Sequence, residues 1–133
     1  MKRWILLLAF VGAAPSALAL TMAEVNARWL AGHTEGLLPH ALHFARHDIA
    51  QAQFIAGSLL IRRDRRREVF EGYNFIMTAA YAGHVKAQTQ MALFALHGTI
   101  HEPQPDEARW WAVKAAQSED PDAYYLLGWM HSQ

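Results

Sequence analysis

The chain has 133 residues, and its 12 Lys and Arg residues are balanced by 12 Asp and Glu residues, so the formal net charge at pH 7 is zero. Dedicated nucleic-acid-binding proteins usually carry a strong basic excess, so we expect no nucleic acid among the partners. The sequence contains no cysteine, which excludes disulfide bonds, a lipid-modified cysteine and a cysteine nucleophile.

Residues 1–19 have the pattern of a cleavable secretory signal peptide. The positive start MKR is followed by the apolar run WILLLAFVGAA and the small-residue end PSALAL. The apolar run is too short to span a bilayer comfortably. We therefore predict cleavage after Ala19 and a periplasmic or secreted protein that is free of the membrane; the alternative is a retained anchor helix. Cleavage would also remove Lys2 and Arg3, leaving 10 basic and 12 acidic residues.

The rest of the chain predicts an all-α fold, because it is rich in good helix formers and has no alternating apolar and polar strand pattern. Asp48 and Gln51 have the spacing of a capping box. Gly83 is suited to end a helix, and Pro105 and Pro121 to begin one. We expect helices over residues 22–32, 37–47, 49–62, 67–82, 84–97, 105–118 and 121–131.

Small residues recur at a fixed spacing along these helices. The segment AAYAGHVKAQTQMA (79–92) matches AAQSEDPDAYYLLG (115–128) with an offset of 36 residues, and a third trace lies 35 residues earlier. The recurring positions are Ala52, Ala87 and Ala123, and Gly57, Ala92 and Gly128. A small residue at a fixed position allows two helix backbones to approach closely once in each helical hairpin. Hairpins with such periods are the units of α-solenoids.

Residues 93–128 resemble the Sel1-like repeats, a branch of the tetratricopeptide-like solenoids. The match consists of a turn with Gly98 and Ile100, an Ala-x-x-Trp pair at Ala108 and Trp111, and the ending Lys114, Ala115 and Ala116. The preceding unit has Gly72 and Phe75 in the Ala-x-x-Trp positions, followed by Ala79, Ala80 and Gly83. Two positions depart from the family pattern: Glu119 stands where the family usually has glycine, and residues 62–64 (RRD) replace a glycine-rich turn.

The resemblance implies a short right-handed α-solenoid of antiparallel helical hairpins. Residues 49–133 would form about two repeats and a terminal helix, and residues 20–48 an N-terminal helical extension or degenerate half-repeat. It also implies a non-catalytic adaptor or scaffold that binds other proteins. The spacing of the apolar residues independently places Trp111 and Phe75 in the core.

The histidines allow a different function, metal binding. His40, His43 and His47 lie at i, i+3 and i+7, so one helix face could present three imidazoles to Zn²⁺, Cu²⁺ or Ni²⁺. The same face is expected to be exposed to solvent, which is compatible both with a metal site and with no function. A periplasmic metal-binding protein is therefore an alternative to the adaptor.

Catalytic motifs are absent from the sequence. There is no G-x-S-x-G motif and no phosphate-binding G-x-x-x-x-G-K-[ST] loop. Most acidic residues lie at expected helix starts and turns, where the helix dipole accounts for them. We predict no catalytic residue and no cofactor; a small hydrolase is the remaining alternative, and it would need paired carboxylates or a Ser–His contact.

Two surfaces are candidates for binding a protein partner. The first is the run of Arg62, Arg63, Arg65, Arg66 and Arg67. A shift by one repeat places this run on the turn at 97–102, so it is either a solvated charged turn or a contact for an acidic partner, such as residues 118–122 of a second copy. The second surface is the last predicted helix, where Tyr125 and Trp129 could anchor a partner helix or mediate self-association.

Overall fold

The computed structural model describes residues 19–133, and within them the chain is entirely helices and turns. The predicted signal peptide falls almost wholly on residues 1–18, outside the described part. The helices are α2 (Met22–Leu30), α3 (Leu38–Ala45), α4 (Ala50–Arg62), α5 (Arg66–Tyr81), α6 (Val85–His97), α7 (Pro105–Ala116) and α8 (Pro121–Ser132). The all-α prediction is confirmed, with each helix boundary within two residues of the expected one.

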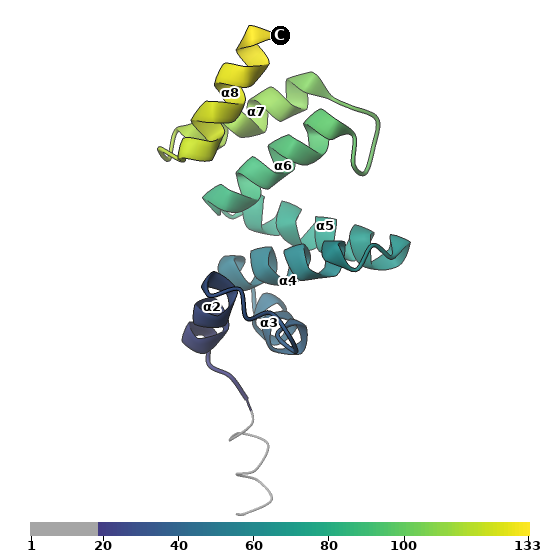
Figure 1. The fold of residues 1–133 in the computed structure, drawn as a ribbon, viewed down its shortest axis with the longest axis vertical. Coiled ribbons are helices and arrows are strands. Elements are labelled where there is room, and N and C mark those ends of the chain that lie inside the picture. Colours follow the sequence, from purple (N-terminus) through teal and green to yellow (C-terminus); the bar gives the residue numbers. More distant parts are fainter. Residues whose placement is uncertain (1–18) are drawn as a thin grey trace, which may run out of the picture.

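Each helix packs mainly against its neighbours in the sequence. The most extensive contacts join α4 to α5 and α6 to α7, and the pairs α3–α4, α5–α6 and α7–α8 connect them into one row. Figure 1 shows this row running from α2 and α3 at one end of the molecule to α8 at the other. None of these seven helices is both long and apolar enough to cross a membrane.

The backbone of the turns follows the repeat that the sequence predicts. Residues with positive φ precede α4, α6 and α8 at Asp48 (60°), Gly83 (96°) and Glu119 (59°), which are 35 and 36 residues apart. A second series precedes α5 and α7 at Asp64 (54°) and Gly98 (67°), 34 residues apart. Left-handed backbone costs roughly 1–2 kcal/mol for residues other than glycine. Asp48, Asp64 and Glu119 therefore adopt a strained conformation that glycine adopts freely at Gly83 and Gly98.

The capping box predicted at Asp48 is wrong. Asp48 lies in the turn after α3 with its left-handed backbone, and the residue that precedes α4 is Ile49, which makes no side-chain cap hydrogen bond. Because of this left-handed turn, Asp48 lies one residue before the N-cap position of α4. The other predicted helix ends and starts are confirmed. Helix α5 ends just before Gly83, and Pro105 and Pro121 are the first residues of α7 and α8.

The predicted core positions are buried. Trp111 is 1% exposed, and the alanines of the repeat line the helix contacts with exposed fractions of 0–9%. These alanines are Ala52, Ala79, Ala80, Ala87, Ala92, Ala108, Ala115, Ala116 and Ala123. Phe75 is partly buried and packs against the apolar cluster at the α2–α4 end of the molecule. The apolar stripes read from the sequence therefore do form the core.

Gly57 of α4 and Gly72 of α5 mark the closest helix approach. A Cβ atom added to either residue would lie 2.6 Å from the carbonyl oxygen of the other, closer than van der Waals contact permits. Gly128, the third member of the small-residue series, is different: it is exposed, and an added Cβ would meet nothing within 4 Å. The expectation of a close helix contact at Gly128 is therefore wrong, because no helix of residues 19–133 packs on that side of α8.

Hydrogen bonds between polar side chains join every second helix of the chain. Gln51 of α4 donates to Asn26 Oδ1 of α2 at 2.8 Å, and its own Oε1 lies 2.5 Å from Nε2 of His84, the residue that precedes α6. Farther along, Lys86 of α6 binds Asp120 and Asp122 at the start of α8 at 2.9 and 3.0 Å. These bonds connect α2, α4, α6 and α8, which are not sequence neighbours.

The buried Gly57 and the exposed Gly128 give a matched test of helix spacing. We expect Gly57→Ala to lower the free energy of unfolding by about 1–3 kcal/mol, because the methyl group must push α5 away. Gly128→Ala should raise it by up to about 1 kcal/mol, since alanine favours helix and the methyl group enters open space. Urea unfolding measures both. A Gly57→Ala variant as stable as the parent would contradict the close approach.

Candidate functional site

The arginine run forms the connection between α4 and α5, as the repeat offset predicts. Arg62 is the last residue of α4 and Arg66 the first of α5. Arg63 and Arg65 both approach Glu68, at 3.4 and 3.9 Å. All five arginines of the run are exposed. They are therefore available to a partner, although exposed ion pairs such as those to Glu68 contribute little stability.

Arg62 differs from the other four in its surroundings. Its guanidinium carbon lies 5.0 Å from the centre of the Trp29 ring, in the geometry of a cation–π contact. The Trp29 ring meets Phe54 edge-on with 6.1 Å between centroids, and Phe54 stacks on His84 at 4.9 Å. The flat side chains of Arg62, Trp29, Phe54 and His84 thus form a continuous stack from α2 across α4 to the start of α6.

A groove of about 270 Å³ lies along this stack of side chains, between α2, α4, α5 and α6. Its lining is mostly apolar, with Arg62 as its single charged residue. The lining residues are Trp29, Phe54, Ser58, Ile61, Arg62, Ile76, Gln90 and Phe94. Of this set, only Arg62 is predicted from the sequence to contact a partner. Phe54 was recognisable as an aromatic residue outside the α4 core stripe of Ala52, Ile55 and Ala56, but nothing in the sequence pairs it with Trp29.

Two of the three acidic residues in the segment 118–122 bind Lys86 within the chain. Asp120 is 5% exposed, and its carboxylate accepts hydrogen bonds from Lys86 at 2.9 Å and from Thr89 at 2.7 Å. Burial by itself would raise the pKa of Asp120, but the hydrogen bonds from Lys86 and Thr89 together outweigh it and hold that pKa below its usual value. The suggested contact between this segment and the arginines of a second copy is therefore not available to Asp120, and Asp122 shares the same lysine.

Asparagine substitutions separate the buried acid from the exposed one. We expect Asp120→Asn to lower the free energy of unfolding by about 1–3 kcal/mol, because it weakens two hydrogen bonds to a buried charge. Asp122→Asn should change it by less than about 1 kcal/mol, since exposed ion pairs contribute little. Thermal unfolding at neutral pH compares the two. Equal effects on the free energy of unfolding would show that Asp120 contributes no more to the α6–α8 contact than Asp122 does.

His84 connects α4 and α6 in its neutral form. Its Nδ1 accepts a hydrogen bond from the backbone N–H of Ala87 at 3.1 Å and so caps the start of α6, which leaves Nε2–H to donate to Gln51 Oε1. Burial lowers the pKa of His84 below its ordinary value of 6.5. A proton on Nδ1 would face the Ala87 N–H and break the cap, which agrees with that direction.

This arrangement predicts a pH-dependent part of the stability. The unfolded chain protonates His84 at a higher pH than the folded chain does, so the contribution is complete above about pH 6.5 and is lost as the pH falls through the lowered folded pKa. His84→Asn keeps a cap acceptor but cannot titrate. We expect the stability difference between the parent and this variant to shrink between about pH 8 and pH 5 in urea unfolding. A constant difference would contradict the neutral cap.

His40 and His43 of α3 and His47 of the turn that follows it are not assembled into a ligand set. Across residues 19–133, no three His, Cys, Asp or Glu side chains are grouped in a way that could hold a metal ion. His43 and His47 are exposed, with their ring centres 4.8 Å apart, and His47 Nδ1 bonds to the backbone oxygen of His43 at 2.7 Å. One nitrogen of His47 is thus engaged with the helix itself.

The predicted anchor residues of α8 are exposed: Tyr125 at 77% and Trp129 at 43%, beside Tyr124 at 54%. Trp129 also lines a shallow groove of about 250 Å³ together with Leu96 of α6 and Arg109 of α7. The aromatic residues thus form an exposed surface at the α8 end of the row, opposite the end that carries Trp29.

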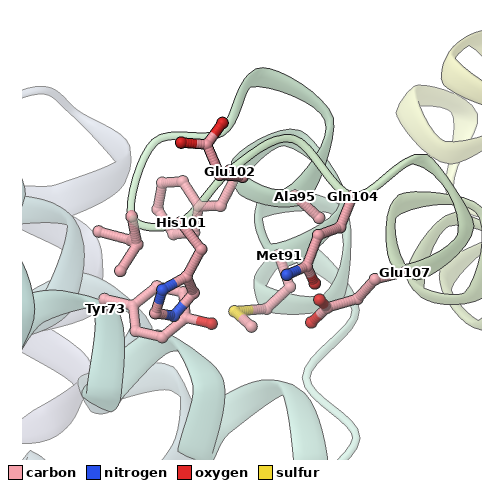
Figure 2. A pocket seen from close by; sticks show the side chains of 9 residues that line it. Tyr73, Met91, Ala95, His101, Glu102, Gln104 and Glu107 are labelled. Carbon is pink, nitrogen blue, oxygen red and sulfur yellow. The ribbon is translucent and has the colours of Figure 1, made fainter.

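A small crevice lies where α5 meets the α6–α7 connection. Figure 2 shows Tyr73, Met91, Gln104 and Glu107 directed into it, with His101 beside the Tyr73 ring. Its volume is about 10 Å³, enough for one water molecule. Burial, and then the charge of Glu107, raises the pKa of Tyr73.

Comparison with family models, with curated proteins and with solved structures found no match.

Proposed function

We propose that the protein is a secreted or periplasmic Sel1-like repeat adaptor, built as a short right-handed α-solenoid, that binds other proteins without catalysis. The observation that carries the proposal is the repeated turn geometry, in which positive φ recurs every 34–36 residues at Asp48, Gly83 and Glu119 and at Asp64 and Gly98. Packing that is most extensive between sequence neighbours also supports it, because solenoid repeats contact mainly their neighbours.

In this proposal residues 20–48 extend the row at its N-terminal end and residues 49–133 form the repeats. Two exposed surfaces would contact partners: the arginine run between α4 and α5, and the aromatic surface of Tyr125 and Trp129 on α8. Arginine binds carboxylates through two parallel hydrogen bonds, and exposed tyrosine and tryptophan are enriched at binding hot spots. Secretion after Ala19 would place both surfaces outside the cytoplasm.

Site-specific photo-crosslinking in the native host tests the adaptor function. We expect a photoreactive residue at Tyr125 or Trp129 to capture one reproducible partner, and Arg65→Glu combined with Arg66→Glu to reduce the yield about tenfold through charge repulsion. Arg28→Glu combined with Arg46→Glu is the matched control, because both arginines are exposed and lie outside the run. A strictly monomeric protein that gives no reproducible adduct at either position would contradict the proposal.

A further inference from the structure

The groove between α2, α4, α5 and α6 combines apolar aromatic walls with a single positive charge. Trp29, Phe54 and Phe94 provide flat apolar walls, and Arg62 provides one guanidinium at the rim. The volume of about 270 Å³ is below the roughly 300–1,000 Å³ that is typical of pockets enclosing a whole small molecule. The groove therefore fits one bulky side chain of a larger partner better than a free ligand.

Arg62 is prepared to bind a carboxylate. Its cation–π contact with Trp29 restrains the guanidinium, and within residues 19–133 none of its N–H groups donates a hydrogen bond to another side chain. Among residues 19–133, no carboxylate lies within ion-pair distance of Arg62, whereas Arg63 and Arg65 both reach Glu68. Residues 62–68 contain five arginines, one aspartate and one glutamate, so this end of the groove carries a net charge of +3.

We propose that this groove binds a protein segment that carries an aspartate or glutamate next to a bulky apolar side chain. The apolar side chain enters between Phe54 and Phe94, and the carboxylate meets Arg62 with bidentate geometry. The charge of the groove selects the acidic residue, and its apolar walls distinguish such a segment from a small free anion. The inference rests on the proposed function in that the ligand is a protein, but it uses neither Tyr125 nor Trp129.

Selection of short random peptides displayed on phage, with the full chain as the bait, tests this inference directly. We expect the enriched peptides to share an acidic residue within one or two positions of Phe, Trp, Tyr, Leu or Ile. A synthetic peptide of the enriched sequence then serves as the probe in fluorescence anisotropy. Its Kd should rise about tenfold with Arg62→Glu and with Ser58→Phe, which fills the groove.

Arg66→Glu is the matched control, because it makes the same change of charge in the same run but outside the groove lining. We expect it to raise the Kd by no more than about threefold, through the long-range field alone. Exchanging the acidic residue of the peptide for lysine should restore binding to the Arg62→Glu variant, an effect that a merely structural role of Arg62 would not produce.

Three results would overturn the inference: no enriched peptide, an enriched sequence without acidic residues, or equal losses with Arg62→Glu and Arg66→Glu. Circular dichroism of each variant verifies that it is folded, and Arg62→Gln, which keeps much of the side-chain stem, replaces Arg62→Glu if that variant unfolds. None of these results bears on crosslinking at Tyr125 and Trp129. The proposed groove ligand can therefore be wrong while the proposed adaptor function is right, and the reverse.

Discussion

The contact between Gly57 of α4 and Gly72 of α5 sets the spacing of the most extensively packed helix pair. Neither position admits a Cβ atom, so the two backbones lie close enough for Ile76 of α5 to reach the α4 backbone at Gly57. This spacing brings the α5 side chain of Ile76 to the base of the groove, where it meets residues of α4 and α6. A wider helix pair would open that base and separate the walls.

Buried polar side chains provide a second set of contacts between helices that follow one another in the sequence. The buried glutamines Gln53 and Gln88 occupy equivalent places, 35 residues apart, and donate to the carbonyl oxygens of Ala45 and Ala80 at the ends of the preceding helices. Each of these carbonyls also accepts a backbone hydrogen bond from the turn that follows its helix, so the glutamine supplies a second donor at the helix end. The apolar contacts thus hold neighbouring helices, and the polar contacts fix the relative positions of successive helix pairs.

The helices, the repeat and the buried alanines could be predicted from the sequence, because helix periodicity and small-residue spacing are local patterns. The positions of Trp111 and Phe75 followed from the same pattern. The groove could not be predicted, because it depends on Trp29 of α2 reaching Arg62, 33 positions along the chain. The same holds for Lys86 and Asp120, which lie 34 positions apart in the sequence and form an ion pair only in the folded chain.

The single-file arrangement of the helices has a consequence for how the molecule opens. Within residues 19–133, α2 and α8 have neighbouring helices on one side only, whereas α5 and α6 are held from both sides. Local opening therefore costs least at the two ends, and amide hydrogen exchange should be fastest in α2 and α8 and slowest in α5 and α6. Both the Trp29 wall of the groove and the aromatic surface of α8 lie on these more easily opened ends. A partner that binds at either end would contact helices that open easily rather than the most rigid part of the chain.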